Sequence, residues 1–164
     1  DYIDLGNLEY LGGLETDDED RPIVKAVWIE ACIRDGAKKT RKGKDVTAGL
    51  MVDDDTRILY KGPKTGEKLV LDSNFRLYCP VVVQRARIMR TRPMFKSWEI
   101  KFTLNYNTEL LNEKDIVQYM ETASLQVGFC DYRPRYGRFK VVSCVSISDE
   151  AAERMRNEEP ANTI

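Results

Sequence analysis

Apolar and polar residues alternate in several parts of the chain, and this period of two is typical of β-strands. Residues 98–106 show the clearest alternation and predict a half-buried antiparallel strand. Residues 75–88 are rich in β-branched and aromatic residues and predict a long strand, interrupted near Pro80. A last strand is expected at residues 139–147.

Apolar residues spaced three and four apart predict two helices. Asp20 and Pro22 are favourable first-turn residues for the first helix, whose apolar stripe is Val24, Val27, Trp28, Ala31 and Cys32. Asn112 is expected to cap the second helix, with Asp115 as its third residue. The inner stripe of this second helix is Ile116, Val117, Met120 and Ala123.

The segments between these elements are short or polar. Residues 5–14 are expected to form a short packed segment, and the basic stretch 38–44 predicts a mobile surface loop. Short strands at 48–52 and 58–60 are expected to flank a turn at residues 53–55. With a first strand at or before the start of the chain, the order becomes βαββαβ. We therefore expect an α+β fold with a ferredoxin-like or RRM-like antiparallel sheet, two helices and a basic loop insertion.

Composition limits the domain organisation and the compartment. A chain of 164 residues, 42% of them hydrophobic, is long enough for one globular core. We expect a single RRM-like domain over residues 1–148 and a polar, acidic tail over 149–164. No apolar run approaches the roughly 18 residues of a membrane span, and no signal peptide opens the chain, so we expect a cytoplasmic protein without membrane contact.

The chain has no histidine, which removes the commonest general base and the commonest zinc ligand. Its cysteines are widely spaced without a CxxC pair, so buried reduced thiols are favoured over a disulfide framework or a zinc site. They are Cys32, Cys79, Cys130 and Cys144. The acidic residues 53–55 predict a turn rather than a metal site, because a cation would need further ligands from elsewhere. We expect no catalytic residue, no metal and no cofactor.

A net charge of −1 conceals a separation of charge along the chain. The first 20 residues contain acidic but no basic residues, the end of the chain is also largely acidic, and three basic clusters lie between them. The charge of each region indicates the kind of partner better than the net charge of the whole chain does.

The first cluster consists of Arg85, Arg87, Arg90 and Arg92. On a strand, Arg85 and Arg87 would share one face, while a turn or bulge would redirect the other two. Side chains on one face repeat at about 6–7 Å, which matches successive phosphates of a single strand. A solvated strand face or a charge-protected edge is the alternative. Because no acidic residue lies between Asp72 and Glu99, binding is favoured.

The second cluster interleaves arginines with aromatic residues between two glycines, and consists of Tyr132, Arg133, Arg135, Tyr136 and Arg138. Phe139 follows as a further ring. Aromatic rings provide stacking surfaces for bases and arginines neutralise phosphates. The alternative is a packed loop whose arginines pair with Asp131. The third cluster, Lys38, Lys39, Arg41 and Lys42, is the weakest signal, since basic loops are commonly only solvated.

The stretch from Arg90 to Trp98, the strand and helix after it, and the segment from Leu125 to Phe139 together resemble the RAMP superfamily. These are RNA-binding proteins that include the backbone subunits of CRISPR effector complexes. In that family a glycine-rich loop after the second helix helps to hold the RNA, and Gly128 and Gly137 would be its glycines. The pattern is most similar to small stand-alone members carried by bacteriophages.

The resemblance implies binding of RNA or other single-stranded nucleic acid, assembly along a row of identical subunits or in a larger ribonucleoprotein, and residence in the host cytoplasm. Family members that process RNA often use a histidine, so a chain without one resembles the non-catalytic members. Two alternatives stay open. One is a phage-encoded assembly subunit that acts on a host complex without binding nucleic acid. The other is a metal-dependent nuclease that uses residues 53–55 or Asp131.

Overall fold

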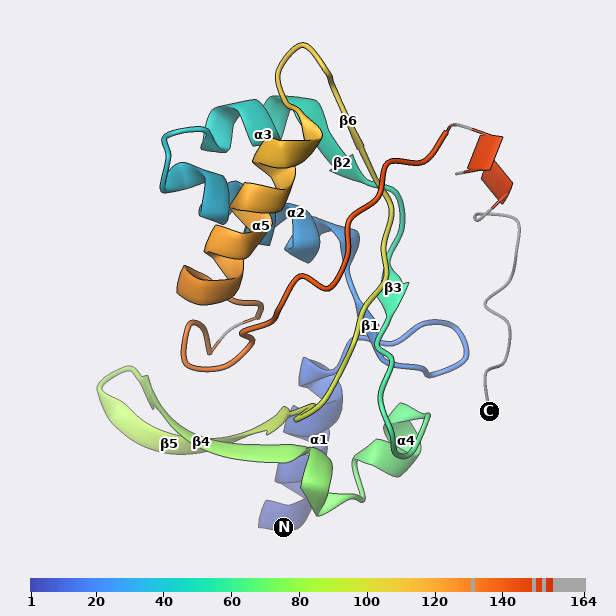
Figure 1. The fold of residues 1–164 in the computed structure, drawn as a ribbon. Coiled ribbons are helices and arrows are strands. Elements are labelled where there is room, and N and C mark those ends of the chain that lie inside the picture. Colours follow the sequence, from blue (N-terminus) through green and yellow to red (C-terminus); the bar gives the residue numbers. More distant parts are fainter. Residues whose placement is uncertain (131, 149, 152, 155–164) are drawn as a thin grey trace. The chain divides into compact units, whose positions relative to one another are not determined.

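The computed structural model describes all residues except 131, 149, 152 and 155–164. It contains both helices and antiparallel strands, as the α+β prediction requires. The chain divides into two compact units, each built from two stretches of sequence (Figure 1). Unit 1 comprises Asp1–Ala26 and Asp54–Phe102, and unit 2 comprises Val27–Asp53 and Thr103–Ile164. That residues 1–148 form one domain stays a prediction.

Unit 1 combines a helix with a long hairpin. Helix α1 (Tyr2–Gly13) packs against strand β5 (Ala86–Pro93), which pairs with strand β4 (Arg76–Val83) over its whole length. The close approach depends on Gly6, where a Cβ would lie 3.2 Å from the Thr91 hydroxyl. A helix here differs from the short packed segment expected at residues 5–14.

The rest of unit 1 supplies its apolar core. Strands β1 (Ile23–Val24) and β3 (Thr56–Arg57) pair antiparallel, and helix α4 (Gly66–Leu69) and the 3-10 helix η1 (Ser73–Phe75) lead into the hairpin. Tyr10, Leu69 and Val70 are buried together. The rings of Tyr60, Phe75 and Phe95 meet edge-on around them, with centroids 4.8–5.7 Å apart.

Unit 2 packs helices beside a small antiparallel pair of strands. Helices α2 (Ala26–Lys38), α3 (Gly43–Gly49) and α5 (Glu113–Gln126) accompany strands β2 (Leu50–Val52) and β6 (Leu104–Tyr106) (Figure 1). Gly36 allows α2 to contact α5, because a Cβ there would lie 2.3 Å from the Tyr119 carbonyl oxygen. Strand β2 is tied to α2 by the Val52 amide, which donates to the Glu30 carboxylate at 2.8 Å.

The second predicted helix is confirmed together with its cap. The Asn112 side chain accepts a hydrogen bond from the Asp115 amide at 3.0 Å, and Ile116 and Ala123 of the predicted stripe are buried. The first predicted helix starts later than expected, at Ala26, because residues 23–24 form β1. Its buried face also differs from the predicted stripe: Ile29, Cys32, Ile33, Gly36 and Ala37 are buried.

The strand predictions need larger corrections. Residues 75–88 are not one strand, because the chain reverses at Gln84 and returns as β5. Residues 98–106 do not form one continuous strand. Their strand pairing is limited to an isolated bridge between Glu99 and Leu59 and to the pairing of β6 with β2. Residues 139–147 contain no paired strand. The described strands form three separate two-stranded sheets in place of one four-stranded sheet.

The basic stretch 38–44 is not a loop insertion, because it contains the end of α2, a tight turn and the start of α3. The described residues contain no disulfide, and Cys32 and Cys79 are buried, while Cys130 and Cys144 are exposed. Within the described part of the chain, no helix combines the length and the apolar character needed to cross a bilayer.

Candidate nucleic-acid interface

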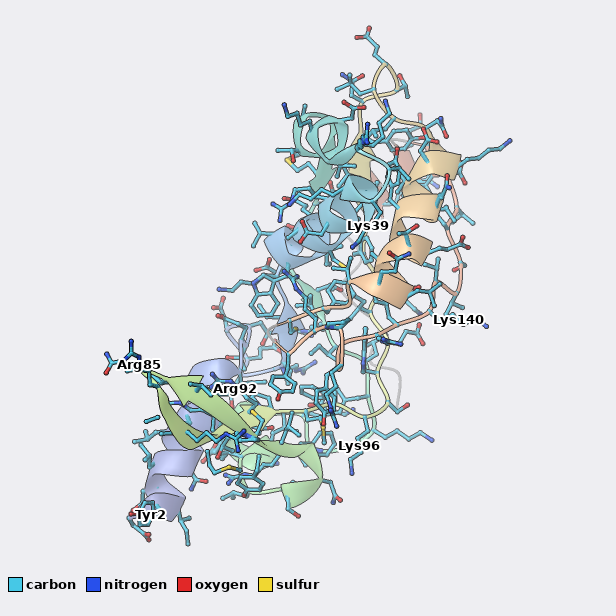
Figure 2. All side chains as sticks on the ribbon, turned by 90° about the vertical axis from the view of Figure 1, so that its left-hand side faces the viewer. Tyr2, Lys39, Arg85, Arg92, Lys96 and Lys140 are labelled. Atoms are coloured by element: carbon cyan, nitrogen blue, oxygen red, sulfur yellow. The ribbon has the colours of Figure 1, made fainter. Side chains whose placement is uncertain are left out.

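The β4–β5 hairpin presents the first arginine cluster at its tip and along one strand. Its two-residue turn consists of Gln84 and Arg85, with φ of 48° and 69°. A turn of this kind requires positive φ at both positions and is usually Asn-Gly, because other side chains are strained there. The strained turn places Arg85 at the far end of the hairpin, while Arg92 lies near its base (Figure 2).

Strand register divides the arginines between two faces of the hairpin. Arg90 and Arg92 lie opposite Cys79 and Leu77, whereas Arg87 lies opposite Val82. Because successive side chains of a strand point to opposite faces, Arg90 and Arg92 share one face and Arg87 lies on the other. The predicted pairing of Arg85 with Arg87 on one strand face is wrong, because Arg85 belongs to the turn.

Arg90 has a structural role. Its guanidinium forms an ion pair with Glu9 of α1, and the adjacent Thr91 amide donates to the other oxygen of the same carboxylate at 3.1 Å. The hydrogen bond from Thr91, followed by that from Arg90, lowers the pKa of Glu9 below its ordinary value. Glu9 thus anchors α1 to β5 and neutralises one of the four predicted arginines.

The other three arginines of the hairpin form no ion pair with a described residue, although the charge of Arg92 also acts on Glu9. Among the residues that the structure describes, Arg85, Arg87 and Arg92 have no carboxylate within ion-pair distance. Arg85 and Arg87 are exposed, and the stem of Arg92 runs past Gly13 at the end of α1. Three cationic groups therefore remain available for an anionic partner.

In unit 2, the second cluster lies in a loop closed by its two glycines. Gly128 and Gly137 both have φ of 76°, a conformation that favours glycine. The Phe129 amide donates to the Gly137 carbonyl at 2.8 Å, and a Cβ on Gly137 would lie 2.0 Å from the Phe129 carbonyl oxygen. The loop is fixed to α2 by the Cys32 thiol, which donates to the Gly128 carbonyl at 3.5 Å.

The loop holds two tyrosines side by side. The Tyr132 and Tyr136 rings have centroids 5.6 Å apart and an interplanar angle of 37°, and both residues are about two-fifths exposed, at 41% and 37%. The Arg135 guanidinium lies 6.0 Å from the Tyr136 ring centroid. Phe139 instead packs against Phe129 at 4.8 Å, so its ring supports the loop and is not a free stacking surface.

The remaining arginines of the loop are partly committed to the protein. Arg138 donates from Nε to the Pro134 carbonyl at 2.9 Å, and Arg133 lies 3.6 Å from the Asp35 carboxylate. Asp131 lies outside the described residues, so its pairing with these arginines stays a prediction.

Asp35 brings the second and third clusters together within unit 2. Its carboxylate contacts Lys38 at 2.8 Å and Arg34 at 3.1 Å in addition to Arg133. Burial alone would raise the pKa of Asp35, but the hydrogen bonds from Lys38 and Arg34 outweigh it and lower that pKa. Three cations around one carboxylate leave a net positive charge beside a shallow groove. The groove is lined by Asp35, Lys38, Lys39, Gln126, Val127, Arg133 and Pro134.

The third cluster is partly self-neutralised. Lys42 pairs with Asp45 at 2.9 Å, and this hydrogen bond raises the pKa of Lys42. Lys39 and Arg41 are exposed and have no acidic partner in the described part of the chain. Arg41 lies in the turn between α2 and α3 and has a φ of 63°.

The acidic residues that could suggest metal chemistry have structural contacts. Asp55 accepts a hydrogen bond from the Ala26 amide at 2.8 Å, and Asp53 accepts one from the Asn105 side chain. Over the described ranges, no group of three or more acidic or cysteine side chains is placed to hold a metal ion.

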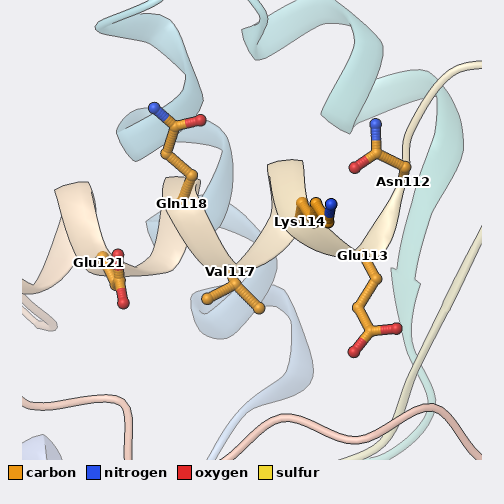
Figure 3. A pocket seen from close by; sticks show the side chains of 6 residues that line it. All are labelled: Asn112, Glu113, Lys114, Val117, Gln118 and Glu121. Carbon is orange, nitrogen blue, oxygen red and sulfur yellow. The ribbon is translucent and has the colours of Figure 1, made fainter.

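A second hollow lies along the outer surface of α5 and contains none of the predicted residues. Figure 3 shows its lining side chains along one helix. They are Asn112, Glu113, Lys114, Val117, Gln118 and Glu121. Acidic and basic groups are mixed in it and no set of them converges on a common point, so it has no features of a specific site.

Sequence analysis missed Asp35, the residue that organises the cations of unit 2. Its spacing of three residues before Lys38 on a helix was an available signal. Its contact with Arg133 was not, because that contact depends on how the loop folds back onto α2.

Comparisons of the chain with protein-family models, with characterised proteins and with solved structures found no match.

Proposed function

We propose that this protein binds single-stranded nucleic acid, with RNA preferred, and performs no chemistry on it. The observation that carries the proposal is the set of arginines on the β4–β5 hairpin that form no ion pair with a described residue, Arg85, Arg87 and Arg92. Arginine binds phosphate through paired hydrogen bonds and also stacks on bases. A strained turn that positions Arg85 at the tip of the hairpin is consistent with a binding role.

Unit 2 supports the same proposal with a different chemistry. Tyr132 and Tyr136 offer partly exposed rings, and the groove beside Asp35 carries an excess of positive charge. Rings combined with cations are the usual means of binding single strands without sequence preference. Because the hairpin and this loop belong to different units, each is proposed as a contact surface in its own right.

The proposal also includes a protein family, a fold and a cellular location. The RAMP resemblance favours RNA and a phage-encoded protein that acts in the host cytoplasm, as a homo-oligomer or within a larger ribonucleoprotein. A ferredoxin-like core is supported by α2 and α5, which pack together in the unit that contains the β2–β6 pair. A four-stranded sheet would need two more strands beside that pair.

Fluorescence anisotropy tests the proposal. Labelled single-stranded RNA, single-stranded DNA and duplex DNA of about 16 nucleotides, the upper range of single-strand site sizes, would be titrated with the protein at several salt concentrations. We expect binding to single strands that weakens with salt, tightest for RNA. Absence of salt-sensitive binding to any single strand would exclude the proposal, and cleavage of the RNA in magnesium or manganese would exclude its non-catalytic part.

A second candidate function is protein interaction or assembly without nucleic acid. It is favoured by α1, which exposes Leu5, Leu8 and Leu11 while its Gly6 and Tyr10 face the hairpin and core. Large exposed apolar residues in a row are characteristic of contact surfaces. Assembly detected by light scattering that ignores both salt and oligonucleotide would favour this candidate.

A further inference from the structure

Residues 139–147 form an extended segment without a strand partner. None of their backbone amides or carbonyls makes a hydrogen bond to another described residue. The segment nevertheless has the composition of a strand, with three valines and an isoleucine, and Val142 and Val145 are 86% and 76% exposed. Figure 1 shows it as the stretch that follows α5 and its loop.

Two properties of this segment favour its pairing with another strand. Its free amides and carbonyls are a template for strand pairing, and β-branched side chains gain packing when a neighbouring strand covers them. Alternation places Phe139, Val141, Val145 and Ile147 on one face, with Ser143 between them. A largely apolar face and free backbone groups both favour strand addition.

We propose that this segment pairs antiparallel with the same segment of a second copy of the chain, around a two-fold axis at Ser143. Charge favours this partner and this direction. Basic Arg138 and Lys140 lie at the start of the segment and acidic Glu150 lies just after its end. Lys140 points outward from the structure (Figure 2). An antiparallel copy brings basic ends to acidic ends, whereas a parallel copy would align like charges.

The position of the axis follows from the apolar face. With the axis at Ser143, Val141 lies opposite Val145 and Phe139 lies opposite Ile147, so apolar side chains meet apolar side chains. A shift of the pairing by one residue would place the apolar face of one strand against the polar face of the other.

Molar mass in solution, measured without nucleic acid, tests the proposal independently of the proposed function. Sedimentation velocity of the full chain over a concentration series should show a monomer–dimer equilibrium. The variant Val145→Lys should be monomeric, because it places a charge on the paired face. Leu125→Lys is the matched control: Leu125 is 69% exposed on α5, outside the segment, and this variant should dimerise like the wild type. Circular dichroism of each variant would confirm its folding.

Disulfide cross-linking tests the axis. In a background of Cys130→Ser and Cys144→Ser, copper-phenanthroline oxidation should join two chains through a cysteine introduced at Ser143. A cysteine introduced at Ser146 in the same background should cross-link less, because it does not face itself. A monomeric wild type, a dimer that survives Val145→Lys, or equal cross-linking at every position would overturn the proposal. Protection of amides 139–147 from hydrogen exchange in a monomer would assign the segment to its own chain instead.

Discussion

The two arginine-rich segments of this protein use their charge in different ways. On the β4–β5 hairpin of unit 1, three of four arginines form no ion pair in the described part of the chain, although the charge of Arg92 also acts on Glu9. In the loop of unit 2, Arg133 and Arg138 contact Asp35 and Pro134, and the loop is closed by two glycines. The hairpin therefore offers free charge, whereas the loop offers a prebuilt shape with two rings.

This difference predicts two kinds of contact with a single strand. Free arginines release counterions when they bind phosphates, so their contribution falls steeply as salt rises. Stacking on Tyr132 and Tyr136 depends on ring position and much less on salt. Substitutions that weaken the arginine contacts but not the stacking, or the stacking but not the arginine contacts, test this comparison.

The largest effect is expected from Gly137→Ala. The new Cβ would lie 2.0 Å from the Phe129 carbonyl oxygen at a φ of 76°, so the loop cannot close. We expect a loss of about 3 kcal/mol or more in the free energy of unfolding of unit 2, from strain and clash together. Urea denaturation would measure it. Gly12→Ala is the control: no atom lies near its Cβ, and alanine should stabilise the exposed helix end slightly. Equal stability of the two variants would contradict the closed loop.

Removal of both loop rings comes next. Tyr132→Ala combined with Tyr136→Ala should weaken binding of single-stranded RNA by about 1–3 kcal/mol for each stacked base. The slope of binding against salt should stay that of the wild type, because no phosphate contact is lost. Anisotropy titrations at several salt concentrations measure both quantities. If the variant changed the slope of binding against salt but kept the wild-type affinity at low salt, the loop would contact phosphates and would not stack on bases.

Arg85→Gly should have effects of opposite sign on stability and on binding. Glycine relieves the positive φ of 69° in the turn, so the free energy of unfolding of unit 1 should rise by about 1 kcal/mol. RNA binding should weaken, because the charge at the tip is lost. Thermal unfolding and anisotropy of the same preparation test this pair of outcomes. If Arg85 were only structural, the variant would be stabilised with unchanged affinity.

The smallest effect is expected at the ion pair between Arg90 and Glu9. The lowered pKa of Glu9 means that its contribution to stability is complete above the unfolded-state pKa, near 4.5, and is lost as pH falls through the lower folded-state pKa. Glu9→Gln should therefore lower the midpoint of thermal unfolding at neutral pH, and the difference from wild type should shrink in acid. Glu67→Gln, an exposed control in unit 1, should leave the midpoint of thermal unfolding at neutral pH close to that of the wild type. A difference that grows in acid would contradict the role of Glu9.

Local signals in the sequence predicted some elements well. Helix α5 was predicted with its cap because the Asn112 side chain accepts from the Asp115 amide, and the Asp115 carboxylate accepts from the Asn112 side chain, within one turn of the chain. The hairpin turn was missed because Gln84 and Arg85 are not turn residues and adopt positive φ only when the paired strands impose it. Helix α1 was missed because its leucines face outward, which removes the usual amphipathic pattern.

The candidate site was predictable as a list of residues but not as an arrangement. Charge clustering identified Arg85, Arg87 and Arg92, yet no local pattern indicated that Arg90 would be neutralised by Glu9, 81 positions away. The convergence of Lys38 and Arg133 on Asp35 likewise depends on long-range folding. Patterns of neighbouring residues indicate which groups carry charge, and only the fold indicates which charges stay free.

The dependence of RNA affinity on salt, compared between wild type and a hairpin variant, tests the central claim most directly. The variant combines Arg85→Ala, Arg87→Ala and Arg92→Ala, and its matched control removes the same charge from the exposed lysines of unit 1, Lys61, Lys68 and Lys101. If each arginine contacts one phosphate, the slope of log affinity against log salt should be shallower by about 2 in the hairpin variant, and the lysine control should keep the wild-type slope. Equal slopes for the hairpin variant and the lysine control would show that the hairpin arginines do not bind the strand.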